Sequence, residues 1–216
     1  MKRILLVDDH DIIRKGLKIL LAENQLFAAV QIDEADTEED LTRLVKQNGY
    51  QIIVLDMRLP GIDFSKTMEW INTVSPASHI LIFTDNPEEI YAMRCFQLGA
   101  KGFIRKTEHN PEICKAIQKV RNGEKYMSTH FSELLIDTIK NPRHTQNPFD
   151  KLTTREMEIV SQLDNGKSLT DISKLLMLEY STVSTYKRRI FEKLNIDSIL
   201  SLSRLKQSFT QQHTNN

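Results

Sequence analysis

Three aspartates stand where short apolar runs of the sequence end, a position from which carboxylates can act together. Asp8 and Asp9 directly follow the run Arg3–Val7, and Asp56 directly follows Ile52–Leu55. Carboxylates that converge on one place repel each other unless a cation neutralises them, and a hard divalent ion such as Mg²⁺ takes oxygen ligands of this kind. An aspartate carboxylate can also attack phosphorus as a nucleophile. The three residues therefore predict a magnesium site that supports phosphoryl transfer.

A hydroxyl and an amine follow two further apolar runs. Thr84 follows Ile80–Phe83, and Lys106 lies just past Gly102–Ile104. With a metal ion, these groups could hold the three equatorial oxygens of a phosphoryl group during in-line transfer, which needs mainly positioning and charge stabilisation. Taken singly, each residue has a simpler interpretation, since an Asp pair after a strand is often a turn or a helix cap. The order and spacing of the whole set carry the prediction.

The elements that must bring these residues together alternate between strands and helices. Apolar runs predict five strands, at Arg3–Val7, Ala28–Asp33, Ile52–Leu55, Ile80–Phe83 and Gly102–Ile104. Amphipathic stretches predict five helices, at Asp11–Leu21, Glu38–Asn48, Ser65–Val74, Pro87–Leu98 and Pro111–Arg121. The alternation predicts a doubly wound α/β unit with a five-stranded parallel sheet. Ligands bind beyond the carboxyl ends of such strands, so the polar residues are expected to meet at one edge of the sheet.

Residues at the ends of these helices agree with the assignment. Asn110 is expected to cap the last helix, with Pro111 as its first residue. Gly99 and Gly123 fall where helices are expected to end, at positions that favour a left-handed backbone.

The rest of the chain shows helix signals without strand signals. Ser128–Lys140 predicts one more helix, and the polar stretch 141–148 with its two prolines indicates a linker. Thr153 and Glu156 match a capping box that opens a helix to about Asp164. Further helices are predicted at Ser168–Leu176, Ser181–Leu194 and Ser198–Gln207, and four short helices with a tight break between the second and third predict an all-α helix-turn-helix domain. The predicted divisions are residues 1–124, a linker at 125–147, the helical domain at 148–209 and a frayed tail at 210–216.

The composition excludes several classes of protein. The 216 residues are 40% hydrophobic, which suits two globular domains. No run approaches the roughly 20 apolar residues that cross a bilayer, so no membrane partner is expected. The N-terminus lacks the longer apolar region of a signal peptide, and Cys95 and Cys114 are too few for a disulfide framework or a zinc site. A reduced, cytoplasmic protein is therefore expected.

Four segments of the first domain resemble the signature segments of receiver domains, the flavodoxin-like domains of two-component response regulators. These segments are Leu6–His10, Leu55–Gly61, Thr84 and Gly99–Lys106. The resemblance implies that Asp56 is the phosphoacceptor and that Lys106 pairs with the phosphoryl group.

The same resemblance assigns the remaining pocket residues. It implies that Mg²⁺ is bound directly by Asp9, Asp56 and the backbone carbonyl of Arg58, with Asp8 acting largely through bound water. Thr84 and Phe103 would form a coupled switch pair, although a phenylalanine in an apolar run usually belongs to the core.

Two positions depart from the receiver pattern. Asp85 stands after the switch threonine, where the family usually has a small residue, and Phe64 stands where glycine is common. Because Asp85 adds negative charge near an acidic site, we hypothesise that it weakens accumulation of the phosphoryl group or changes its lifetime.

The second domain is similar to the LuxR-type helix-turn-helix of the NarL/FixJ response regulators. The similarity rests on Leu152–Val160, Gly166, Ile172-Ser173, Ser181–Val183, Ile190 and Lys193-Leu194. In the third predicted helix, Val183, Ile190 and Leu194 share an apolar face that would pack on the earlier helices.

The outward residues of this helix suit the major groove of DNA, where Arg and Lys bind guanine and phosphate. By the family alignment Ser184, Thr185 and Arg188 match base-reading positions, whereas Lys187 and Arg189 are better candidates for phosphate contacts. The basic tripeptide alone would be interpreted as a solvated surface. The family usually has lysine at Ser184 and histidine at Tyr186, so fewer phosphate or guanine contacts are predicted and the target sequence stays open.

The fourth predicted helix carries an apolar stripe. Ile199, Leu202 and Leu205 are spaced to share one face. They are interpreted partly as core and partly as a dimer interface, which the family resemblance implies. A dimer would place two recognition helices on half-sites about 34 Å apart.

These inferences combine into one functional hypothesis. A sensor histidine kinase or phosphorelay protein phosphorylates Asp56, which adds close to two negative charges. The pocket responds, and the protein dimerises and binds double-stranded promoter DNA. The receiver would catalyse only its own phosphorylation and dephosphorylation, so the protein would not be an enzyme with a separate substrate.

Three alternatives stay open. One is a phosphorylation-independent regulator with a degenerate pocket. Another is an Asp-nucleophile phosphatase, which would need a catalytic Asp where Arg58 stands. The last is a protein-interaction adaptor, which would show no salt-dependent DNA binding.

Overall fold

The structure is a computed structural model that describes residues 3–60, 62–140 and 147–214. The chain separates into two compact units, residues 1–62 with 66–128, and residues 129–216 with 63–65. Within the described ranges, no helix is long and apolar enough to cross a membrane. The core of the predicted linker, residues 141–146, and the last two residues of the predicted tail lie outside the described residues.

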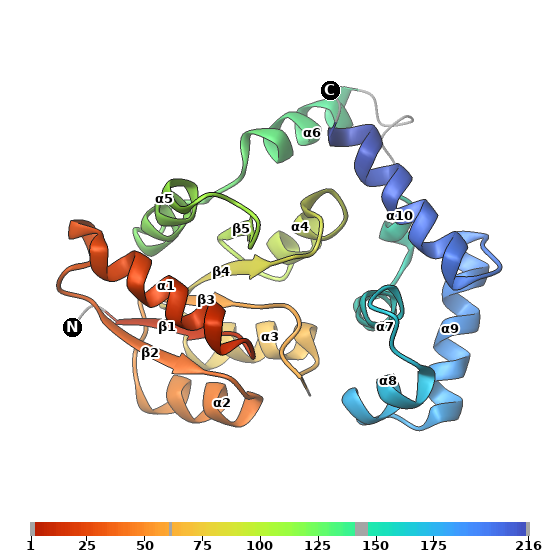
Figure 1. The fold of residues 1–216 in the computed structure, drawn as a ribbon, viewed down its shortest axis with the longest axis horizontal. Helices are drawn as coiled ribbons and strands as arrows, with labels where there is room; N and C mark the ends of the chain where they lie inside the picture. The colour runs from red at the N-terminus through yellow and green to blue at the C-terminus, as the bar shows by residue number, and fades with distance from the viewer. Residues whose placement is uncertain (1–2, 61, 141–146, 215–216) are drawn as a thin grey trace. The chain divides into compact units, whose positions relative to one another are not determined.

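The first unit alternates strands with helices, as Figure 1 shows. Its elements are β1 Arg3–Val7, α1 Asp11–Glu23, the 3₁₀ helix η1 Gln25–Phe27, β2 Gln31–Ala35, α2 Glu38–Gln47, β3 Ile52–Leu55, α3 Phe64–Val74, β4 His79–Thr84, α4 Glu88–Gln97, β5 Gly102–Arg105 and α5 Asn110–Arg121. All strand pairs are parallel, in the order β2-β1-β3-β4-β5. The predicted doubly wound five-stranded sheet is confirmed.

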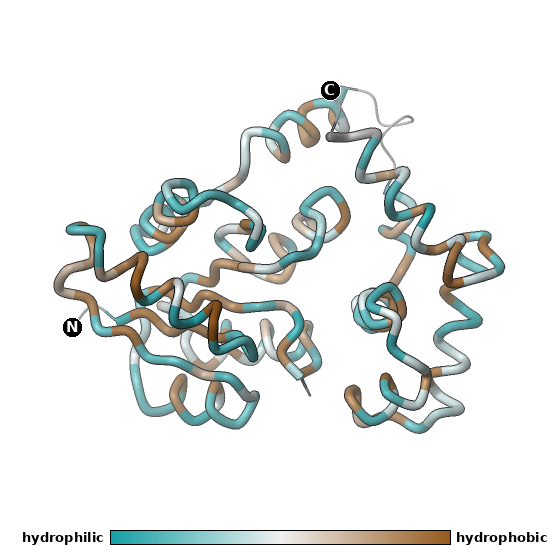
Figure 2. Tube along the Cα trace, in the orientation of Figure 1, coloured by the Kyte–Doolittle hydropathy of each residue, from teal (hydrophilic) through white to brown (hydrophobic). Residues whose placement is uncertain are grey.

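The sheet is buried on both faces, so its inner strands are continuous apolar runs. On one face, residues of β1, β3 and β4 form a cluster with α1 and α5 through Leu17, Leu21, Ile113 and Ile117. Right-handed crossovers in the opposite winding direction place α2, α3 and α4 on the other face. The helices alternate between hydrophilic and hydrophobic residues along their length, as expected when one side of each is buried (Figure 2). The sheet is therefore a rigid base for the residues at its carboxyl edge.

Two local predictions in this unit were wrong. The second strand begins at Gln31 rather than Ala28, because the side chain of Asn24 caps the short helix η1 and the chain turns there first. The N-cap of α5 is His109 rather than Asn110, which is the first helical residue. Gly99 and Gly123 do lie after helix ends, with φ of 94° and 86°.

The second unit is helical throughout its described elements (Figure 1). They are α6 Thr129–Lys140, the 3₁₀ helix η2 Pro148–Lys151, α7 Thr154–Asp164, α8 Leu169–Leu175, α9 Tyr180–Leu194 and α10 Ile199–Thr214. The capping box of Thr153 and Glu156 is confirmed. Helix α10 is longer than the predicted Ser198–Gln207 and runs into the predicted tail. Phe209, the last residue before that tail, is buried.

Candidate functional site

The strand ends bring the predicted polar residues together at the carboxyl edge of the sheet. The Asp56 amide donates to the carbonyl of Val7 at 2.9 Å, so the residue after β3 is held beside the end of β1. The Lys106 amide donates to the carbonyl of Thr84 at 2.9 Å, which ties the end of β5 to the end of β4. These main-chain hydrogen bonds fix the backbone positions of Asp56 and Lys106, from which the two side chains extend.

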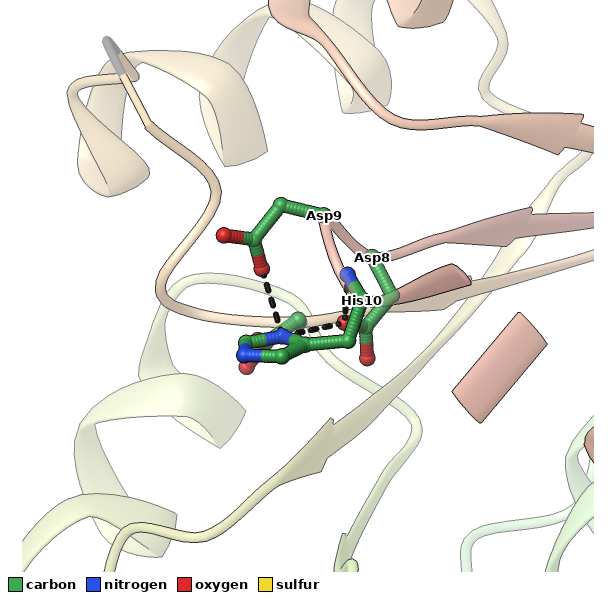
Figure 3. Close-up of side chains that lie close together, drawn as sticks. Asp8, Asp9 and His10 are labelled. Carbon is green, nitrogen blue, oxygen red and sulfur yellow. Dashed lines mark hydrogen bonds and ion pairs between the residues drawn. The ribbon is translucent and has the colours of Figure 1, made fainter. Parts of the chain in front are cut away.

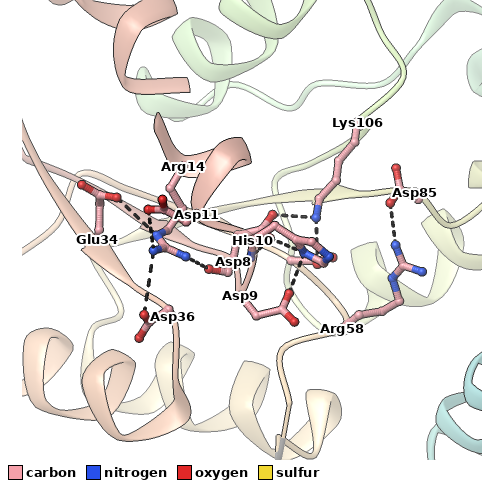
Figure 4. Close-up of polar contacts among 11 residues, drawn as sticks. Asp8, Asp9, His10, Asp11, Arg14, Glu34, Asp36, Arg58, Asp85 and Lys106 are labelled. Carbon is pink, nitrogen blue, oxygen red and sulfur yellow. Dashed lines mark hydrogen bonds and ion pairs between the residues drawn. The ribbon is translucent and has the colours of Figure 1, made fainter. Parts of the chain in front are cut away.

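Lys106 lies between two of the carboxylates. Its Nζ is 2.6 Å from Oδ2 of Asp8 and 2.9 Å from Oδ2 of Asp56, and the three side chains are at most 5% exposed (Figure 4). Burial raises the pKa of Asp56, and the charge of Lys106 offsets this only in part. Burial alone would lower the pKa of Lys106, but the charges of Asp56 and Asp8 raise it overall. The lysine is therefore a permanent cation at neutral pH.

The remaining oxygens suit a cation. Oδ1 of Asp56 is buried and has no hydrogen-bond partner among the described residues. Asp8, Asp9 and Asp56, together with His10, offer ligand atoms that all lie within 4.8 Å of one another. The Asp9 side chain is 31% exposed, which gives the cluster an open side. Because a hard divalent cation prefers several carboxylate oxygens and retains water ligands, the residues present fit Mg²⁺.

Two neighbours of the carboxylates escaped the sequence analysis. His10 Nδ1 lies 2.8 Å from Oδ1 of Asp9 and 3.1 Å from Oδ1 of Asp8 (Figure 3). Buried Arg14 donates to the main-chain carbonyl of Asp8 at 2.6 Å and pairs with Glu34 at 3.2 Å, which fixes the loop after β1 (Figure 4). The position of His10 beside the Asp pair was an available signal, whereas the Arg14 contact depends on the tertiary fold.

Asp85 is paired with Arg58. The guanidinium Nη2 of Arg58 lies 2.5 Å from Oδ2 of Asp85, which joins the loop after β3 to the loop after β4 (Figure 4). Arg58 also lowers the pKa of Asp56, against the larger effect of burial. The negative charge noted in the sequence is thus partly neutralised. The Arg58 backbone carbonyl stays a predicted metal ligand, and Phe64 is the first residue of α3.

Both predicted switch residues are inside the domain. Thr84 is 0% exposed, and its hydroxyl accepts a hydrogen bond from Nδ2 of Asn86 at 3.3 Å. Phe103 lies opposite Ile82 in the sheet and is 1% exposed. The structure therefore has Phe103 in the inward position, and its movement with Thr84 stays a prediction.

The predicted recognition helix is α9 of the second unit. Val183, Ile190 and Leu194 are buried, so the predicted apolar face is confirmed. The break before this helix is tight because Met177 adopts a left-handed conformation with φ of 50°. At the far end Lys193 pairs with the buried carboxylate of Glu156 at 2.6 Å, which locks α9 to α7.

The predicted DNA-binding side chains of α9 differ in their exposure. Ser184, Arg188 and Arg189 are exposed, and Thr185 and Lys187 are half-buried. Arg188 forms an i,i+4 pair with Glu192 at 3.2 Å, with both side chains more than 60% exposed. Exposed pairs of this kind contribute only about 0.3–0.5 kcal/mol, so Glu192 holds Arg188 only weakly.

The apolar stripe of α10 divides in two. Leu202 is 0% exposed and belongs to the core of its own unit. Ile199 is 39% exposed and Leu205 is half-buried, so these two stay candidates for the dimer interface.

Comparisons with known proteins agree with this arrangement. Residues 4–118 match the response regulator receiver domain, and residues 150–205 match the bacterial regulatory proteins of the luxR family. The chain belongs to the response regulators. This response regulator is 32% identical over 205 residues to the response regulator GacA of Pseudomonas aeruginosa, covering 95% of each chain. It is 29% identical to the response regulator UvrY of Escherichia coli, covering 95% of this chain and 93% of the relative.

Solved structures share the fold of the response regulator. RcsB of Salmonella enterica serovar Typhimurium, bound to promoter rprA in the presence of phosphomimetic BeF₃⁻, aligns with a TM-score of 0.69 at 18% identity, covering 95% of this chain and 98% of RcsB. A second RcsB structure aligns with a TM-score of 0.74 at 20% identity, covering 97% and 99%. The receiver and LuxR-type assignments are confirmed, and the chain is a NarL/FixJ-type response regulator with a DNA-binding domain.

Proposed function

We propose that the protein takes a phosphoryl group on Asp56 from a sensor histidine kinase or phosphorelay protein, and that this controls its binding to promoter DNA. The observation that carries the proposal is the state of the Asp56 carboxylate. It is buried, with Oδ2 bound to Lys106 and Oδ1 without a partner among the described residues. A carboxylate already desolvated and held by one cation is prepared to act as a nucleophile toward phosphorus.

Asp9, Asp56 and the Arg58 backbone carbonyl would hold Mg²⁺ directly, with Asp8 acting largely through water. When bound, the ion supplies positive charge against the anionic oxygens of the entering group. Lys106 supplies a second positive charge from its place beside Asp56, and Thr84 supplies a hydroxyl from the neighbouring strand end. In the transfer, an Asp56 oxygen bonds to phosphorus as the bond to the donor nitrogen breaks. The receiver acts on itself and has no separate substrate.

Phosphorylation of Asp56 would change the DNA binding of the second unit. It adds close to two negative charges beside Thr84 and Phe103, and rearrangement there would favour a homodimer. Ser184, Thr185 and Arg188 would read base edges, while Lys187 and Arg189 would contact phosphates. Ile199 and Leu205 would lie in the dimer interface. With a kinase and promoter DNA as its proposed partners, the protein would act in the cytoplasm.

The test is the intact mass of the protein after incubation with Mg²⁺ and a small acyl-phosphate donor. One added phosphoryl group in the wild type and none in Asp56→Asn is the expected result. If a purified kinase also leaves the wild type unmodified, the proposal fails and the phosphorylation-independent regulator becomes the better account.

A further inference from the structure

Helix α9 of the second unit (Figure 1) carries an acidic side chain on its outward side. Arg188 and Glu192 lie two residues before and two residues after the buried Ile190. Because two residues turn an α-helix by about 200°, both side chains point away from the core. They are 68% and 61% exposed, respectively. A helix that meets DNA along this side therefore brings a carboxylate together with its arginine.

The two side chains form a pair and face the same hollow. Nη1 of Arg188 lies 3.2 Å from Oε1 of Glu192. Both residues line an open pocket of about 470 Å³, and Ser184, which is predicted to read a base edge, lines it with them. Lys187 differs, because its Nζ lies over the Phe191 ring, 5.3 Å from the centroid. The carboxylate of Glu192 is thus directed at Arg188 rather than spread over the basic residues.

A carboxylate beside this arginine changes which groups of DNA the guanidinium can bind. A guanidinium has five N–H donors in a planar fork, and the pair with Glu192 engages Nη1. The remaining donors can still reach N7 and O6 of guanine, which are uncharged acceptors in the major groove. A backbone phosphate is an anion, so it must displace Glu192 from Arg188 and is repelled by the carboxylate. The pair therefore favours guanine over phosphate as the partner of Arg188.

We propose that Glu192 is a specificity-determining residue, which keeps Arg188 for guanine by disfavouring its contact with backbone phosphate. Glu192 acts through Arg188 and is a positioning residue rather than a base contact. The exposed pair is weak in water, but interactions between charges strengthen where bound DNA excludes solvent. The inference rests on the proposed binding of promoter DNA through α9 and adds to it a residue that lowers affinity for the wrong sequences.

The chain offers a matched control for the loss of one negative charge. Glu192→Gln keeps the length of the side chain and removes its charge. Glu133→Gln makes the same change at an exposed position of α6, outside the helix-turn-helix. Both glutamates are exposed, so both variants should fold, and a urea titration of each checks this. Arg188→Ala, alone and combined with Glu192→Gln, tests whether the effect passes through the arginine.

The experiment measures affinity by fluorescence anisotropy at several salt concentrations. The probes are a duplex that the wild type selects from random DNA and a shuffled duplex of the same composition. Glu192→Gln should bind the shuffled duplex more tightly and increase the magnitude of its slope of log affinity against log salt by about 0.9, because Arg188 gains a phosphate. The ratio of selected to shuffled affinity should fall about twofold to fivefold. Glu133→Gln should change neither the slope nor the ratio, and neither should Glu192→Gln in the Arg188→Ala background.

Two results would overturn the inference. A ratio that falls as much in the Arg188→Ala background would show that Glu192 contacts a base by itself. Equal changes on both duplexes, matched by Glu133→Gln, would reduce Glu192 to a general surface charge.

The same data separate this inference from the proposed function. A wild type that selects no sequence and binds both duplexes equally would refute the proposed promoter binding. A wild type that selects a sequence, with a ratio that Glu192→Gln leaves unchanged, would refute the role of Glu192 alone.

Discussion

Replacing Asp85 by Asn tests how the charges beside Asp56 are balanced. The substitution keeps the shape of the side chain and removes its charge, so the Arg58 guanidinium is released from its 2.5 Å pair with Asp85. An acyl-phosphate donor is an anion, and more net positive charge near the pocket should attract it. We expect Asp85→Asn to speed phosphorylation of Asp56, and Arg58→Gln, which leaves Asp85 unneutralised, to slow it.

The magnitude follows from the exposure of the pair. The Arg58 and Asp85 side chains are 23% and 47% exposed, so solvent screens them substantially. Exposed ion pairs are worth about 0.2–1 kcal/mol, which corresponds to a change of about 1.4- to 5-fold in rate for each single variant. In the double variant both charges are absent, and the rate should return close to that of the wild type.

The assay is a time course of intact mass with a small acyl phosphate and Mg²⁺, followed by decay after the donor is removed. A double-mutant cycle then gives the coupling between the two residues. Single variants that shift the rate in the same direction, or a double variant as slow as Arg58→Gln, would refute the charge-balance reasoning. No change in rate or lifetime in any variant would also remove the hypothesis that Asp85 tunes the phosphoryl group.

Three further predictions concern DNA binding and stability. Lys187→Ala should weaken binding to all DNA sequences and reduce the magnitude of the slope of log affinity against log salt by about 0.9. Arg188→Ala should weaken the free energy of binding to the preferred sequence by about 1–3 kcal/mol and relax specificity. Fluorescence anisotropy measures both. The Lys193 pair helps to hold the pKa of Glu156 below its ordinary value of 4.5, against the effect of burial. That stabilisation is present above pH 4.5 and is lost as the pH falls through the lower pKa of the folded state. Glu156→Gln should therefore lower the free energy of unfolding by about 1–3 kcal/mol at pH 7, as measured by urea titration. The difference between wild type and variant should shrink in acid. Gly102→Ala would place a Cβ 2.8 Å from side-chain carbons of both Leu81 and Val120 in the core. This overpacking should lower the free energy of unfolding by about 1–3 kcal/mol in the same titrations.

The sheet could be predicted from the sequence where strands are fully buried. β3 has the predicted bounds Ile52–Leu55, because a continuous apolar run between polar residues has few alternatives. β2 was misplaced because it is an edge strand, half-buried along most of its length, and its hydrophobic pattern is weak. Phe27 in η1 and Phe209 in α10 are buried by residues distant in the sequence. The local sequence pattern therefore did not predict η1 or the full length of α10.

The candidate site divides in a similar way. The convergence of Asp8, Asp56 and Lys106 follows from parallel topology, since strand ends of one sheet share an edge. The partner of Asp85 could not be predicted, because Arg58 is 27 residues away and the contact depends on side-chain conformation. His10 was adjacent to the Asp pair, but only the direction of its ring shows that it faces both carboxylates.

The most direct test of the central claim is the DNA affinity of the protein with and without phosphorylation at Asp56. A duplex selected from random DNA by the phosphorylated protein serves as the probe, and fluorescence anisotropy at fixed salt gives the dissociation constant. The account predicts that phosphorylation tightens binding by the wild type and leaves Asp56→Asn unchanged. Equal affinity of the phosphorylated and unphosphorylated wild type would contradict it and would make the receiver pocket irrelevant to DNA binding.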